Sequence, residues 1–198
     1  MRITRVPRWT QWAFPGMEWR TQNGCILPTF DDGPHPDITP WVLEQLRRYN
    51  AKGVFFLVGE NALRFPEIVK AIQNEGHLIG NHSMTHLNGL QTPTNVYVDD
   101  VIKASSHTST TLFRPPYGKI KPQQYTELKQ RGYRIMMWEV LSYDFDQSAE
   151  ANDCLRILDK HTRAGSIVVF HDSEKAWPRL EHTLPTWLKN NRKTLNRE

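Results

Sequence analysis

The sequence has few cysteines and no long apolar run. Its 198 residues include only two cysteines, Cys25 and Cys154, whose spacing matches no metal motif or disulfide framework. We therefore expect two buried cysteines without a disulfide, which favours a reducing compartment. No stretch of about 18 apolar residues occurs, so the sequence predicts no transmembrane helix. No internal repeat or low-complexity linker divides the chain, and its length suits a single domain.

A strong excess of one charge is also absent. The chain has 25 basic and 21 acidic residues, and the basic ones are scattered, except in the tail at residues 191–198. We interpret this charge as solvated surface, and we predict no nucleic-acid partner. The N-terminal residues 1–24 are basic but lack the apolar segment of a secretory signal peptide. Trp9, Trp12 and Trp19 predict an aromatic arm packed on the domain, with sugar stacking or an interface or membrane contact as alternatives.

Short apolar runs alternate with helical patterns along the whole chain. Strands are expected at residues 25–30, 53–59, 77–82, 111–118, 133–140 and 166–172. Helices are expected at residues 39–50, 65–76, 95–107, 122–132, 151–165 and 179–190. Repeated strand–helix units predict a parallel sheet with right-handed crossovers. About seven units in so short a chain indicate an α/β fold, a distorted and short (β/α) barrel.

Polar residues stand where the expected strands end. They are Asp31 and Asp32, Asn81 and His82, Arg114, Asp144, and His171. In barrels of this kind the active site lies at the carboxyl ends of the strands. The sequence therefore predicts that these residues meet at one end of the barrel.

Two neighbouring aspartates and two histidines indicate a metal site. The Asp31 and Asp32 carboxylates repel each other unless a cation compensates them. His82 and His86 are four residues apart, which on a helical turn places both imidazoles on one face. A third, anionic ligand would leave coordination positions open for water and substrate. We expect one aspartate to bind the metal and the other to act as a base; the alternative is that the histidines are structural or lie on the surface.

Five segments resemble, in order, the motifs of the polysaccharide deacetylases, also called the NodB-homology group or carbohydrate esterase family 4. These segments are "TFDDGP" (29–34), "HSMTH" (82–86), "RPPYG" (114–118), "LSYDF" (141–145) and "VVFHD" (168–172). The resemblance covers residues 25–190. It implies a distorted (β/α) barrel and metal-dependent hydrolysis of N-acetyl, sometimes O-acetyl, groups on a polysaccharide.

In the resemblance, the first three motifs supply the metal site and the base. Asp32, His82 and His86 would hold one divalent metal, most often zinc, with cobalt or nickel as alternatives. Asp31 would be the general base that takes a proton from the metal-bound water as it attacks the acetyl carbonyl. Arg114 would pair with Asp31 and orient it.

The last three motifs would supply the acid and the pocket. His171 would protonate the departing amine, and Asp144 would tune its pKa. The backbone N–H of Tyr117 would help to stabilise the oxyanion. The pocket wall would come from Pro116, Tyr117, Phe145 and Val169.

The chain departs from the family pattern at three positions. Leu141 stands for an aspartate, Phe145 for a tryptophan and Val169 for a leucine. None of these changes removes a metal ligand, the base or the acid. The sequence therefore predicts an N-deacetylase of a peptidoglycan- or chitin-like glycan; the alternatives are an O-acetyl esterase of the xylan type and a catalytically weak glycan-binding protein.

Several questions stay open from the sequence. Asp172 is equally consistent with capping a turn and with orienting His171, and Glu139 is expected to be structural. The visible sequence predicts a cytoplasmic location, whereas an enzyme acting on a cell-wall polymer would need export. The oligomeric state is not predicted.

Overall fold

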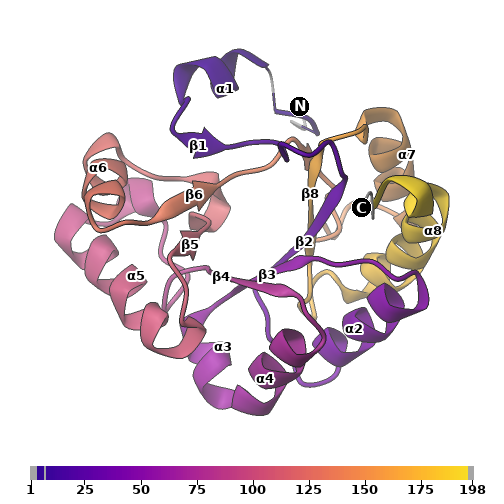
Figure 1. Cartoon of the computed structure of the whole chain (residues 1–198), viewed down its shortest axis with the longest axis horizontal. Helices are drawn as coiled ribbons and strands as arrows, with labels where there is room; N and C mark the ends of the chain where they lie inside the picture. The colour runs from indigo at the N-terminus through magenta and orange to yellow at the C-terminus, as the bar shows by residue number, and fades with distance from the viewer. Residues whose placement is uncertain (1–3, 7, 196–198) are drawn as a thin grey trace.

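Eight parallel strands form one curled sheet (Figure 1). The computed structural model describes residues 4–6 and 8–195, without the side chains of Arg8, Trp9 and Ala13, so the prediction for Trp9 lies outside the described residues. The sheet order is β1-β6-β5-β4-β3-β2-β8-β7. The strands are β1 Met17–Glu18, β2 Leu27–Asp31, β3 Val54–Leu57, β4 Leu78–Asn81, β5 Leu112–Phe113, β6 Arg134–Met136, β7 Val140–Leu141 and β8 Ile167–His171. The predicted α/β barrel is confirmed.

One extended segment joins the two sides of this sheet. Strands β6 and β7 are separated only by residues 137–139. The first pairs with β5 and the second with β8, so the segment changes partners along its length. The sequence predicts one strand over residues 133–140, whereas the structure divides this segment into two strands because the curled sheet pairs with it from both sides.

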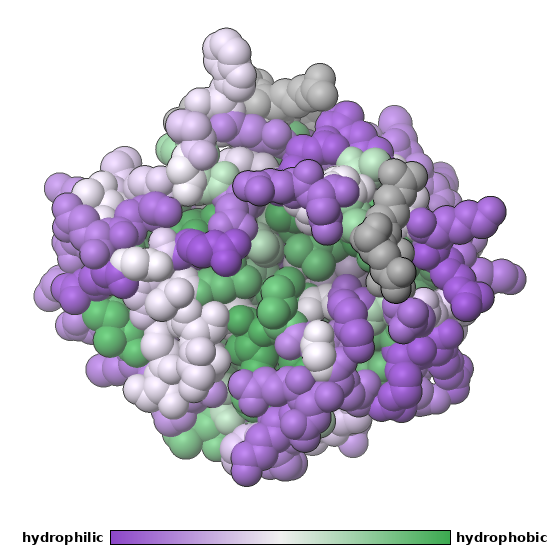
Figure 2. All heavy atoms as spheres, viewed as in Figure 1, coloured by the Kyte–Doolittle hydropathy of each residue, from purple (hydrophilic) through white to green (hydrophobic). Residues whose placement is uncertain are grey.

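Helices cover the outside of the sheet (Figure 1). They are α1 Arg8–Ala13, α2 Ile38–Arg48, α3 Gly59–Arg64, α4 Pro66–Asn74, α5 Thr94–Thr108, α6 Pro122–Gln130, α7 Ala151–His161 and α8 Trp177–Leu195, with 3-10 turns at Gly89–Gln91 and Pro116–Gly118. Helices α2, α7 and α8 present hydrophilic side chains to solvent (Figure 2). Helix α8 continues past residue 190, where the polar tail was expected, because Leu195 is buried in the core. Among the described helices, none has the length and apolar character needed to cross a membrane.

Alternation along the strands separates the core from the barrel interior. Phe30 of β2 faces the helices and stacks on Phe55 and Phe170, with ring centroids 4.9 and 5.8 Å apart. Its neighbours Thr29 and Asp31 point the other way and contact Arg114 inside the barrel. The apolar face of β2 therefore anchors the strand, while the opposite face carries polar groups toward the carboxyl end.

The N-terminal segment is held by strand pairing and by a buried carboxylate. Strand β1 pairs with β6, and Arg5 bridges Val140 in β7. Glu139, which is fully buried, accepts hydrogen bonds from Arg5, Arg20 and Arg163. Ser166, which precedes β8, also donates to it at 2.9 Å. Glu139 is therefore structural, as predicted, and fastens the N-terminal segment to the start of strands β7 and β8.

Replacing Glu139 by glutamine should lower the free energy of unfolding by about 1–3 kcal/mol, because three arginines lose a buried charged partner. Burial alone would raise the pKa of Glu139, but hydrogen bonds from Arg163 and Ser166 and the charge of Arg20 lower it. A lowered folded-state pKa contributes stability above the ordinary glutamate pKa, and that contribution is lost as the pH falls through the folded-state value. Urea denaturation of both proteins at about pH 7 and about pH 3 measures this dependence.

Glu18→Gln is the matched control. Its ion pair with Arg134 is exposed, so we expect a loss below about 1 kcal/mol. A Glu139→Gln penalty as small as that of Glu18→Gln, or one that does not shrink in acid, would contradict the structural role given to Glu139.

Candidate active site

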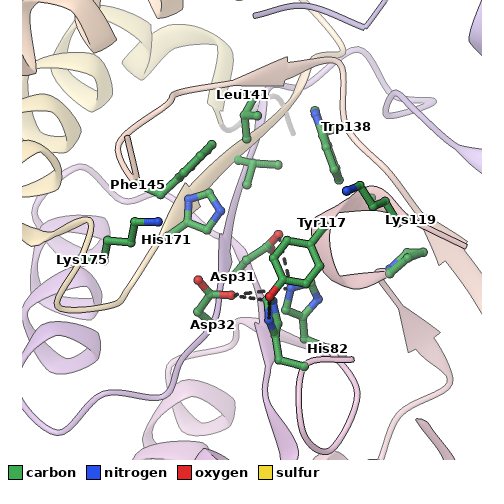
Figure 3. Close-up of a pocket in the computed structure, with 14 residues that line it drawn as sticks. Asp31, Asp32, His82, Tyr117, Lys119, Trp138, Leu141, Phe145, His171 and Lys175 are labelled. Atoms are coloured by element: carbon green, nitrogen blue, oxygen red, sulfur yellow. Dashed lines mark hydrogen bonds and ion pairs between the residues drawn. The ribbon is translucent and has the colours of Figure 1, made fainter. Parts of the chain in front are cut away.

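A cleft of about 500 Å³ opens where the strands end (Figure 3). It is lined by Asp31, Asp32, His82, His86, Pro115, Tyr117, Gly118, Lys119, Trp138, Leu141, Phe145, Val169, His171 and Lys175. The structure therefore brings together residues from all five sequence motifs. Pro116 is buried and is not among these lining residues; its neighbour Pro115 lines the cleft instead.

Asp31 and Asp32 face the same cleft because strand β2 ends at Asp31 and the next residue leaves the strand conformation. Successive residues of a strand point to opposite faces. Asp31 is the last residue of β2, and Asp32 adopts a left-handed conformation with φ 81°, which breaks the alternation. Asn61 fixes the turn by donating a hydrogen bond to the Asp32 carbonyl at 2.8 Å. The chain thus presents two carboxylates side by side, each in its own environment.

The Asp172 carboxylate stabilises this turn through hydrogen bonds. It is fully buried and accepts hydrogen bonds from the Gly33 N–H and from the Thr39 hydroxyl at the start of α2. A Cβ at Gly33 would lie 2.2 Å from the Asp172 carboxylate, so only glycine fits. Burial raises the pKa of Asp172 to about 7. Of the two interpretations left open by the sequence, these contacts favour the turn cap.

Three side chains converge in a geometry that suits a divalent metal. Oδ1 of Asp32 lies 3.3 Å from Nε2 of His86 and 3.7 Å from Nε2 of His82. One ligand atom from each residue lies within 4.8 Å of the others. A carboxylate and two imidazoles are a donor set that zinc and related metals accept. The residues present therefore fit the metal that the motifs imply.

The two histidines do not lie on a helical turn, so that part of the sequence analysis was wrong. Residues 82–88 form an irregular loop after β4, and Ser83 and His86 have φ values of 64° and 57°. These left-handed residues bend the loop back on itself. The imidazole rings come within 5.0 Å through this bend rather than through helical spacing.

Hydrogen bonds orient both imidazoles. Nδ1 of His82 lies 2.8 Å from the Arg114 carbonyl and donates to it, which leaves Nε2 directed at Asp32. Nδ1 of His86 pairs with the Tyr117 hydroxyl at 3.2 Å. Burial lowers the pKa of His82 to about 4, although the nearby aspartates oppose this. His82 is therefore neutral at neutral pH, as a metal ligand must be.

Burial alone would raise the pKa of Asp32. Its hydrogen bond with His86 and the positive charge of His171 instead hold that pKa well below its ordinary value. Asp32 therefore stays ionised and available as an anionic ligand over the physiological pH range.

A buried arginine holds Asp31. Nη1 of Arg114 donates to Oδ1 of Asp31 and to the hydroxyl of Thr29, both at 2.7 Å. The other two nitrogens of the same guanidinium also donate: Nε to the Met136 carbonyl and Nη2 to the Met137 carbonyl. Oδ2 of Asp31 is left toward the cleft, 4.0 Å from His82 Nε2. One oxygen of Asp31 is thus held and the other is available to a reactant.

His171 faces the aspartates from the end of β8 (Figure 3). The Asp144 carboxylate accepts two hydrogen bonds from His171, one from the backbone N–H at 2.9 Å and one from Nδ1 at 2.7 Å. Burial alone would lower the pKa of His171, but the charge and hydrogen bond of Asp144 raise it to about 9. Phe145 packs edge-on against the imidazole at 5.0 Å. His171 is therefore a fixed imidazolium at neutral pH.

Apolar side chains form part of the cleft wall. Leu141 and Val169 are register partners in β7 and β8, and both line the cleft. Tyr117 is 60% exposed at the mouth and has φ 59°. The sequence motifs did not predict three lining residues, Trp138, Lys119 and Lys175. Trp138 gave no signal because it belongs to no motif and reaches the cleft only through the bend between β6 and β7.

Comparison with known proteins places this site in a family. Residues 19–136 match the polysaccharide deacetylase family. A peptidoglycan-N-acetylglucosamine deacetylase of Bacillus cereus is 35% identical over 75% of this chain, which spans 56% of that relative. A chitooligosaccharide deacetylase of Azorhizobium caulinodans is 37% identical over 77% of this chain and 76% of its own.

A solved structure agrees with the sequence comparisons. A peptidoglycan N-acetylglucosamine deacetylase, crystallised with 4-naphthalen-1-yl-N-oxidanyl-benzamide, superposes with a TM-score of 0.80 and 29% identity, over 93% of this chain and 92% of that one. The chain belongs to the polysaccharide deacetylase family, which confirms the resemblance seen in its motifs.

Replacing Asp144 by asparagine should lower the pKa of His171 from about 9 to 6.5 or below, because the charge that opposes desolvation is lost. Imidazole NMR resonances of metal-free protein, followed against pH, measure the shift, and His171→Gln assigns the signal. Asp146→Asn, two residues further along the same loop, is the control. A His171 resonance that titrates at the same pH in wild type and Asp144→Asn would refute this origin of the shift.

Proposed function

We propose that this protein is a metal-dependent deacetylase that removes N-acetyl groups from an amino-sugar polymer or oligomer. The observation that carries the proposal is the division of labour between Asp31 and Asp32. One is bound by a buried arginine and keeps an oxygen open, and the other stands between two imidazoles. The names of the relatives, which include peptidoglycan and chitooligosaccharide deacetylases, support the same chemistry.

Asp32, His82 and His86 would hold the metal. When bound, a divalent cation supplies Lewis-acid activation of a carbonyl and of water. Zinc fits this donor set, and cobalt or nickel are alternatives. The hydrogen bond from His82 to the Arg114 carbonyl fixes the tautomer that leaves Nε2 free.

Asp31 would act as general base. Its Oδ1 is neutralised in part by Arg114, while Oδ2 faces the cleft beside the metal ligands. A carboxylate fixed in this way can take the proton from an attacking water without moving. General-base catalysis of this kind contributes about 10²–10⁴-fold.

His171 would act as general acid on the other side of the acetyl group. Amide hydrolysis requires protonation of the departing nitrogen, and an imidazolium whose pKa is about 9 carries that proton at neutral pH. Asp144 fixes Nδ1, so the proton on Nε2 is the one directed into the cleft. Leu141 and Val169 offer an apolar surface for the acetyl methyl.

Changing Asp31 to asparagine should reduce acetate release from acetylated amino-sugar oligomers by at least about 100-fold, because the base is lost. Metal content should stay unchanged, since Asp31 is not one of the three ligands. Acetate assays and metal analysis of the same preparations provide the measurement. Asp99→Asn, on the exposed face of α5, is the control. Undiminished turnover in Asp31→Asn would show that the base has been assigned to the wrong residue.

Removing the metal with a chelator should abolish acetate release, and zinc or cobalt should restore it. Replacing His86 by alanine should lower bound zinc from about one per chain, because one of three protein ligands is missing. His182, which is exposed on α8, provides the control variant His182→Ala. Full activity in thoroughly chelated protein would rule out the metal-dependent reaction.

Parallel assays on acetylated xylan separate the two acetyl chemistries. Release from ester substrates alone would favour an O-acetyl esterase. Oligosaccharide binding without release under any metal would favour a glycan-binding protein.

A further inference from the structure

Two lysines line the cleft without a carboxylate partner. Lys119 and Lys175 are both exposed, and neither forms an ion pair with any residue in the described part of the chain. Each ammonium instead lies beside an aromatic ring of the cleft, Lys119 at 6.0 Å from the Tyr117 centroid and Lys175 at 5.7 Å from that of Phe145. Both cations are therefore available to an incoming ligand.

The two lysines stand on opposite sides of the reactive centre (Figure 3). Lys119 follows the 3-10 turn Pro116–Gly118, next to Trp138, and Lys175 lies between β8 and α8, beside His171. Because the cleft is open, a polymer that placed one sugar over Asp31 would extend past both sides. The lysines thus stand where the neighbouring sugars would lie.

Among the residues that the structure describes, no acidic side chain pairs with either lysine. The acidic residues that line the cleft are Asp31 and Asp32, and both are engaged, one with Arg114 and one with the histidines. Glu174 precedes Lys175 but lies 3.4 Å from His35 Nε2 and lines a separate hollow. The mouth of the cleft therefore carries two positive charges that form no ion pair with the described residues.

We infer that Lys119 and Lys175 bind acidic groups on the sugars that flank the reacting acetamido sugar, so that this site selects an anionic glycan over a neutral one. The inference rests on the proposed deacetylase function and refines its substrate class. A polymer that alternates N-acetylglucosamine with N-acetylmuramic acid, in which the lactyl carboxylates are free, offers a negative group on each side of a reacting N-acetylglucosamine. A chitin-like homopolymer offers only hydroxyl groups at the same places.

The chemistry of lysine suits this task. A compact ammonium on a flexible stem reaches a carboxylate whose position varies along a polymer. Exposed ion pairs contribute little singly and are screened by salt, so the preference should appear mainly in KM and should weaken as ionic strength rises. This behaviour separates recognition by charge from an effect on the chemical step.

Three matched substrates test the inference with the metal-loaded full chain. The first is an alternating oligosaccharide of N-acetylglucosamine and N-acetylmuramic acid with free lactyl carboxylates. The second is the same oligosaccharide with each carboxylate converted to a methylamide. The third is a neutral chitooligosaccharide of equal length. Acetate release gives kcat and KM for each, at low and at high salt.

We expect kcat/KM to be higher for the free acid than for its methylamide, and the difference to shrink at high salt. Lys119→Gln and Lys175→Gln should each lower kcat/KM for the acid by up to about fivefold, mainly through KM, and leave the methylamide unchanged. The double variant should remove most of the preference. Lys70→Gln, exposed on α4 and outside the cleft, should behave as wild type.

The outcomes distinguish this inference from the proposed function. Equal kcat/KM for acid and methylamide, or a preference that survives in the double variant, would overturn the role of the lysines while leaving deacetylation intact. A loss in the double variant that is equal for all three substrates would also overturn it, because that loss would reflect packing against Tyr117 and Phe145. Absence of acetate from every substrate would instead refute the deacetylase proposal.

Discussion

The buried guanidinium of Arg114 is the interaction on which the rest of the site depends. A cation without solvent contact is costly unless an anion and hydrogen-bond acceptors surround it. Here the carboxylate of Asp31 and the carbonyls of Met136 and Met137 do so, and the Phe56 ring lies 4.0 Å away. The Arg114 side chain crosses the barrel interior and links Asp31, at the end of β2, to Met136, at the end of β6. The fold thus holds the Asp31 carboxylate in place, and Asp31 in turn offsets the cost of burying the Arg114 guanidinium.

The same residue also connects Asp31 to the candidate metal ligands. Its side chain holds Asp31, while its carbonyl accepts the hydrogen bond that orients His82. Around it, five non-glycine residues adopt positive φ: Asp32, Ser83, His86, Tyr117 and Tyr143. Such conformations cost about 1–3 kcal/mol each and persist only where surrounding contacts enforce them. Their concentration in the loops at the carboxyl ends of the strands indicates that these loops are shaped for the site rather than for local stability.

The sequence predicted which side chains meet at the cleft better than it predicted their geometry. The motifs and the expected strand ends were enough to predict that Asp31, Asp32 and His171 lie close together, because parallel strands in register bring their carboxyl ends together. The spacing of His82 and His86 predicted a helical turn, but a loop with left-handed residues brings the two rings equally close. Trp138 could not be found, since its place depends on a bend where one segment changes partners between β5 and β8. Long-range pairing of this kind leaves no local pattern.

The cluster around Glu139 has a consequence for how this barrel can change over time. Ser166, which contacts Glu139, and His171 stand at opposite ends of β8, about 16 Å apart along a strand. Effects at such separations are usually additive. Substitutions in the loops around the cleft can therefore lower the free energy of unfolding while they change what the cleft binds. Substitutions near Glu139 can restore that free energy without altering the cleft. Substitutions that change the cleft and substitutions that change stability can therefore be made at separate ends of the barrel, which makes it a practical starting scaffold for directed evolution.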